Sequence, residues 1–251
     1  MATRFSLRAR WLMVVTVVVV GSAAANAQVV RQPPRQLTIS EDILTSFVDQ
    51  PCYHFEQAHD KYLSGDRRAA ANHLRIGAAF LKLEAARATE EGRKGLTASI
   101  RELEQLAFAI EYLQVRTVDT LDKAFANAHF AMAGHHCISS AHRCCQQCSF
   151  SDKQEMTNVG QDLKSAAVHL QNGSRWSGNA ISQETKKVLS STFATADGLI
   201  AGKTVTQPRA LGVIGAFRQR FEDLTGRRLL IAPAPTGLGI SPPNLSGFDN
   251  R

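Results

Sequence analysis

Histidine and cysteine are concentrated in one short stretch of this chain. Four of its eight histidines and four of its five cysteines fall between His129 and Cys148. Thiolate and neutral imidazole are the ligands by which proteins hold zinc and copper(I). The stretch is therefore the first place to look for a soft-metal site, and whether its side chains converge depends on the element that carries them.

The spacing of these residues can be tested against a helix, in which each residue advances about 100° around the axis. On a helix that continues through Gly134, one stripe holds five of the side chains: His129, His136, Cys137, Cys144 and Cys148. The remaining three lie on a second surface: His135, His142 and Cys145. We predict that the stripe of five is a metal site.

The stripe is expected to face the core of the protein. The apolar residues Val118, Phe125 and Met132 fall on the same side of the helix as His129 and His136. A buried site of this kind needs ligands from a neighbouring helix, and the candidates for completing it are Cys52, His54 and His73. The expected occupant is copper or zinc.

The same cluster is compatible with two purely structural roles. Cysteine packs like a small apolar residue, and histidines are common in protein cores, so the stripe can serve only to fill the core. In an oxidising compartment a disulfide from Cys52 to the stripe would join the early helices to this one, although five cysteines leave one thiol over. The alternative function is then a structural or protein-interaction scaffold.

Several enzyme signatures fail at particular residues. Cys145 and Cys148 have the spacing of a covalent haem attachment or a redox pair, but the next residue is Ser149 rather than histidine, and no βαβ pattern surrounds them. Gly202 and Lys203 resemble the end of a phosphate-binding loop, which lacks its first glycine here. We therefore assign no catalytic residues, favour a non-catalytic protein and expect no cofactor apart from a metal ion.

The first 27 residues have the pattern of a cleavable secretory signal. Three arginines precede an apolar run from Trp11 to Val20, and small residues follow up to Ala27. The run is shorter than the ~20 residues that cross a membrane, so we expect export, secreted or periplasmic, with cleavage after Ala27 and no stable membrane anchor.

The charge of the mature chain is mild, because loss of those three arginines lowers the formal net charge from +7 to +4. Basic residues such as Arg93 and Lys94 alternate with acidic ones such as Glu90 and Glu91, as on a solvated helix face. There is no basic block interleaved with aromatic residues. The expected partners are a metal ion or a protein, and nucleic acid is excluded.

Apolar residues recur at three- and four-residue steps along most of the chain and predict an all-α fold. After a short helix at Ser40, we expect helices over the ranges 51–63, 66–90, 96–113, 118–148, 152–172, 182–199 and 208–221. Turns are predicted at Gly92 and Gly95, and Gly173 is predicted to end a helix before Trp176. The fold class is an antiparallel bundle of about six to seven helices.

The domain organisation that follows has four parts. Residues 1–27 form the signal, 28–39 an extended lead-in, 40–225 the helical domain and 226–251 a flexible, disordered tail rich in proline and glycine. The segments 74–81, LRIGAAFL, and 163–170, LKSAAVHL, share three of eight residues. A duplicated helical hairpin would explain this, as would the general likeness of leucine- and alanine-rich helices.

Overall fold

The computed structural model describes residues 50–115, 117–146, 152–178 and 180–229, and these form seven helices and no strand. The helices are α2 (Gln50–Leu63), α3 (Arg67–Arg87), α4 (Glu90–Glu111), α5 (Asp119–Gln146), α6 (Lys153–Trp176), α7 (Gln183–Ile200) and α8 (Gln207–Thr225). The all-α fold class is confirmed. The predicted signal, the lead-in, the short helix at Ser40, Cys148 and most of the proposed tail lie outside the described residues.

Several helices begin at the residues whose side chains can cap them. The carboxylates of Asp66 and Asp152 accept hydrogen bonds from the first turns of α3 and α6, and the Ser182 hydroxyl does the same for α7. Helix α8 has a proline in its first turn and ends at Gly226, whose φ of 66° is the left-handed conformation that glycine adopts readily. Local chemistry therefore sets most of the boundaries.

The predicted turn at Gly92 and Gly95 is wrong. The chain turns at Ala88 and Thr89, and the Thr89 side chain accepts a hydrogen bond from the Gly92 amide at 3.3 Å, which caps α4. Both glycines lie inside that helix. A Cβ on Gly92 would lie 2.9 Å from Nδ1 of His135, so the glycine permits α4 to approach α5 closely.

The predicted end of α6 at Gly173 is also wrong, because the helix continues to Trp176. A Cβ on Gly173 would lie 2.6 Å from the ring of Phe130 on α5. The glycine is therefore needed where two helices pack closely, and it does not mark a C-terminus. Trp176 lies in the last turn of α6, against the apolar cores described below.

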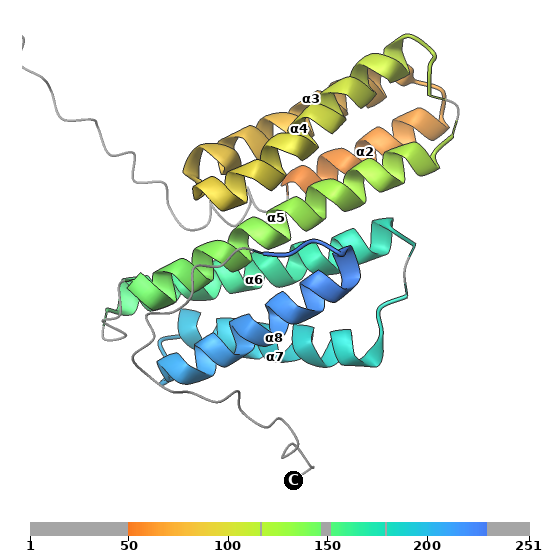
Figure 1. Ribbon diagram of the computed structural model, residues 1–251. Coiled ribbons are helices and arrows are strands. Elements are labelled where there is room, and N and C mark those ends of the chain that lie inside the picture. The colour runs from red at the N-terminus through yellow and green to blue at the C-terminus, as the bar shows by residue number, and fades with distance from the viewer. Residues whose placement is uncertain (1–49, 116, 147–151, 179, 230–251) are drawn as a thin grey trace, which may run out of the picture. The chain divides into compact units, whose positions relative to one another are not determined.

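Helices that follow one another in the sequence pack side by side. Helix α3 packs against α2 and α4, α4 against α5, and α6 against α7, while α8 packs on both α5 and α7 (Figure 1). Helix α5 makes its most extensive contact with α6. It is thus the element shared by an early group of helices, α2 to α4, and a late group, α6 to α8.

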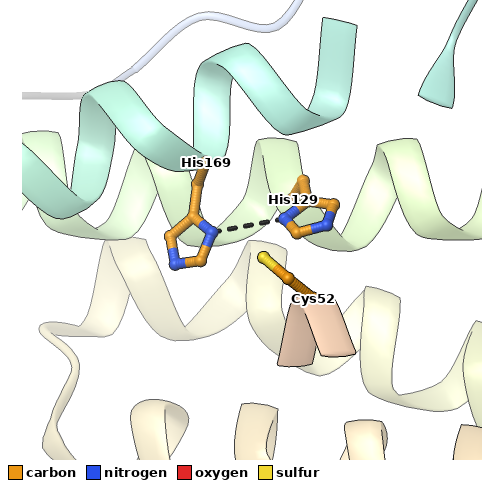
Figure 2. Close-up of side chains that lie close together, drawn as sticks. All are labelled: Cys52, His129 and His169. Carbon is orange, nitrogen blue, oxygen red and sulfur yellow. Dashed lines mark hydrogen bonds between the residues drawn. The ribbon is translucent and has the colours of Figure 1, made fainter. Parts of the chain in front are cut away.

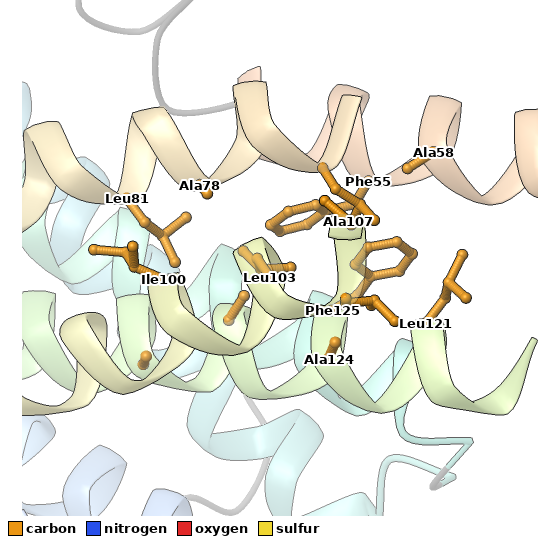
Figure 3. Close-up of a cluster of buried hydrophobic side chains, with 14 of the residues drawn as sticks. Phe55, Ala58, Ala78, Leu81, Ile100, Leu103, Ala107, Leu121, Ala124 and Phe125 are labelled. Atoms are coloured by element: carbon orange, nitrogen blue, oxygen red, sulfur yellow. The ribbon is translucent and has the colours of Figure 1, made fainter. Parts of the chain in front are cut away.

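Two apolar cores lie on the two sides of α5. Figure 3 shows part of the first, in which Phe55, Leu103 and Phe125 come from α2, α4 and α5. The second is built by α5 together with α6, α7 and α8 and includes Phe130. Because both sides of α5 are covered, most of this helix is buried all round. No helix in the described part of the chain is long and apolar enough to cross a membrane.

Candidate metal centre

One thiol and two imidazoles from three different helices meet inside the bundle. Cys52 lies in the first turn of α2, His129 in the middle of α5 and His169 on α6. One ligand atom from each lies within 4.8 Å of the other two, and this is the one such group among the described residues. In Figure 2 the sulfur of Cys52 points toward the two imidazole rings. These three residues could hold a metal ion.

The two imidazoles face each other through their Nδ1 atoms, which are 3.2 Å apart. The rings are buried, with exposed fractions of 0% for His129 and 2% for His169, whereas Cys52 is half-buried. Burial, with a smaller contribution from the charge of Arg175, lowers the pKa of His129 to about 3. Burial and the neighbouring histidines also lower the pKa of His169, so both rings are neutral and keep lone pairs for a metal.

Neighbouring side chains hold the three donors in place. Asn172, less than one turn after His169 on α6, donates a hydrogen bond from Nδ2 to the Cys52 sulfur at 3.2 Å. The ring of Phe55 meets His129 edge-on, with centroids 5.3 Å apart. Nε2 of His129 is buried without a hydrogen-bond partner. Buried polar atoms without a hydrogen-bond partner are uncommon in folded proteins, and a bound ion or water is one explanation for them.

The structure brings one member of the predicted stripe, His129, into this group. His136 stacks on His169, with ring centroids 5.8 Å apart and an interplanar angle of 14°. Its Nδ1 lies 3.2 Å from a carboxylate oxygen of Asp162, which also accepts a hydrogen bond from Arg143. His136 is therefore a neighbour of the candidate site and belongs to an ion-pair network at its edge.

The cysteines of the stripe lie elsewhere. Cys137 and Cys144 are buried in the second apolar core, and Cys148 lies outside the described residues. Burial raises the pKa of the Cys137 thiol to about 12, which keeps it protonated at neutral pH. Within the described part of the chain, no disulfide joins Cys52 to Cys137 or Cys144. These two positions behave as the packing interpretation expects.

The second surface of α5 is not uniformly exposed. His142 is exposed and Cys145 half-buried, whereas His135 is buried. It packs against Gly92 of α4, and its Nε2 lies 3.6 Å from a carboxylate oxygen of Glu84 on α3. Burial raises the pKa of Glu84, but the contact with His135 and the charges of His136 and Arg87 outweigh this effect and lower the pKa to about 2. The sequence analysis placed His135 away from the core because it assumed that only one side of this helix is buried.

The residues named as possible completions have different positions. Cys52 joins the candidate centre, while His54 and His73 form a separate pair on α2 and α3, with their Nδ1 atoms 3.0 Å apart. His169 was not predicted. The sequence feature that could have indicated His169 is its position on the apolar face of α6, three residues after Ala166 and next to Leu170. Histidine at such a position is usually only packed, so the signal is weak by itself.

Comparison of this chain with protein-family models, with curated proteins and with solved structures finds no match.

Proposed function

We propose that this protein binds one soft metal ion, copper(I) or zinc, through Cys52, His129 and His169. The observation that carries the proposal is the convergence of one thiol and two neutral imidazoles within 4.8 Å, from three helices, in the interior of the protein. A mixed sulfur and nitrogen donor set suits both ions.

The spacing of the imidazoles supports this occupant. Zinc lies about 2.0 to 2.1 Å from a histidine nitrogen, so two nitrogens at a tetrahedral centre are separated by roughly 3.3 Å. The observed separation of the Nδ1 atoms of His129 and His169 is 3.2 Å. Asn172 is not itself a ligand, but its hydrogen bond to the Cys52 sulfur would stabilise the thiolate form of that ligand.

The role that fits this location is to join the two groups of helices. Cys52 belongs to the early group, His169 to the late group and His129 to the helix that both share. Phe55 of α2 already stacks on Phe125 of α5, and a metal bond at this point would add a second kind of connection between these helices. No chemistry beyond binding is needed, in keeping with a non-catalytic protein.

A scaffold without metal is the second candidate, and the positions of Cys137 and Cys144 favour it. Both lie among apolar side chains in the second core. The pair of His129 and His169 would then be a hydrogen bond between two tautomers of imidazole, one donating and one accepting. The partner of such a scaffold would be another protein.

Export of the protein is proposed from the N-terminal pattern of arginines, apolar run and small residues. The expected mature protein begins at Gln28 and has no membrane anchor. N-terminal sequencing of material recovered from the periplasm or medium tests this, and recovered protein that still begins at Met1 would contradict it.

The metal proposal is tested with freshly reduced protein, using competition titrations with copper(I) and with zinc. The variant Cys52→Ala should bind at least tenfold more weakly than the unchanged protein. Cys137→Ala is the matched control, because it removes a thiol of the same type outside the candidate site, and it should bind normally. The proposal fails if neither ion binds at micromolar concentration, or if the two variants bind alike.

A further inference from the structure

A second pair of histidines lies apart from the candidate centre, between the first two described helices. His54 on α2 and His73 on α3 are partly buried, and their Nδ1 atoms are 3.0 Å apart. The ring centroids are 5.3 Å apart and the rings are tilted by 33°. Neither ring belongs to the group formed by Cys52, His129 and His169.

The backbone around this pair is held firmly. Helices α2 and α3 are joined by a short turn at residues 64–66 and pack along each other. A Cβ on Gly77 would lie 2.6 Å from the ring of Phe55, so the two helices approach closely near the histidines. The positions of His54 and His73 are therefore set by core packing and do not depend on a ligand.

Aromatic neighbours also restrict the His54 ring. Phe80 stacks on it with centroids 5.8 Å apart, and Tyr53 meets it edge-on at 5.2 Å. One of the two facing nitrogens donates its proton to the other in the present hydrogen bond. For both Nδ1 atoms to bind a metal ion, the donating ring would carry its proton on Nε2 instead, and the ion would lie to one side of the line that joins the two nitrogens.

We propose that His54 and His73 form a second, half-exposed metal site that takes a divalent ion with a preference for imidazole, zinc or copper(II), from solution. The separation of the two nitrogens is within a few tenths of an ångström of the roughly 3.3 Å expected at a tetrahedral centre. Two protein ligands leave positions for water, so this site binds more weakly and exchanges faster than a buried site with a thiolate. The proposal does not depend on the proposed function of the buried group.

The test uses Cys52→Ser protein, in which the buried group has lost its thiolate. Isothermal titration with zinc should still show an ion bound, and adding His73→Ala should weaken that binding at least tenfold. His142→Ala in the same background is the matched control, because His142 is an exposed histidine on α5, and it should leave the zinc affinity unchanged. Equal zinc affinity in the His73→Ala and His142→Ala proteins would overturn the proposal.

A second measurement covers the case in which the His73→Ala protein does not fold. Side-chain NMR of Cys52→Ser protein should show the Nδ1 resonances of His54 and His73 moving to metal-bound values as zinc is added, while those of His142 stay in place. Copper(II) bound to the same protein should give an electron paramagnetic resonance spectrum with coupling to two nitrogens. Unchanged His54 and His73 resonances at saturating zinc would show that the pair is only a hydrogen bond.

Discussion

Two pairs of histidines in this protein have nearly the same geometry and very different surroundings. The Nδ1 atoms are 3.2 Å apart in the pair His129 and His169 and 3.0 Å apart in the pair His54 and His73. The first pair is buried between two cores and has a thiol beside it, whereas the second is half-exposed and has aromatic neighbours. Because the spacing is nearly equal, we expect the two pairs to differ in metal affinity and in stability through burial and through the third donor.

The largest expected difference between the pairs is in the stability of the metal-free protein. His169→Ala leaves a cavity and takes away the hydrogen-bond partner of buried His129, so the free energy of unfolding should fall by roughly 3 kcal/mol. His73→Ala should lower it by less than about 1 kcal/mol, because water can replace the lost imidazole. Urea denaturation with a chelator present measures both. Similar losses of unfolding free energy in the two variants would show that burial does not distinguish the two pairs.

Metal binding should stabilise the protein mainly through the buried pair. At a free metal concentration about one hundred times Kd, binding to the folded state alone adds ~2.7 kcal/mol to the free energy of unfolding. Because Cys52→Ala should bind at least tenfold more weakly, it should lose at least about half of this gain at the same metal concentration, and Cys137→Ala should keep all of it. Thermal unfolding of the three proteins, with and without zinc, gives the comparison. A full gain in Cys52→Ala would assign the stabilisation to another site.

The stability of the metal-free protein should also fall in mild acid. Burial lowers the pKa of His129 to about 3 in the folded protein, whereas an unfolded histidine has a pKa of about 6.5. Because the unfolded state then binds more protons, stability is present above about pH 6.5 and is lost as the pH falls toward 3. From pH 7 to pH 5 the loss from this one group is roughly 2 kcal/mol.

The contribution of His129 to this pH effect has a direct control. In His129→Leu protein the change in unfolding free energy between pH 7 and pH 5 should be smaller, while in His73→Ala protein it should stay close to that of the unchanged chain. Urea midpoints at the two pH values provide the measurement. A pH dependence unaffected by His129→Leu would mean that other groups cause it.

The smallest predicted effect concerns the side chain that contacts the thiol. Asn172→Ala removes the hydrogen bond to the Cys52 sulfur, and loss of such an outer partner should weaken metal binding by about tenfold. Asn158→Ala is the control, since Asn158 lies on the same helix and accepts a hydrogen bond from exposed Gln154. Competition titrations that give both variants the affinity of the unchanged protein would exclude a role for Asn172.

Local signals in the sequence were enough for the fold class and for most helix boundaries. The apolar spacing and the capping residues Asp66, Asp152 and Ser182 act within one or two turns of chain, so they can be recognised without knowing what packs nearby. The glycines misled the boundary predictions. Gly92 and Gly173 lie inside helices because His135 and Phe130 approach them from α5, and that approach is a property of the packed bundle.

The composition of the candidate site could not be predicted from local sequence signals, because it depends on which helices pack together. The concentration of histidine and cysteine correctly indicated α5 and His129. Angular positions counted around a single helix assume that one side of it is buried, but both sides of α5 face an apolar core. Cys137 and Cys144 therefore lie in the second core, away from His129. His169 is 40 residues beyond His129, and Cys52 comes from the first described helix. Only the packing of α2, α5 and α6 decides that these three donors meet, because contacts between distant segments are set by which helices lie side by side.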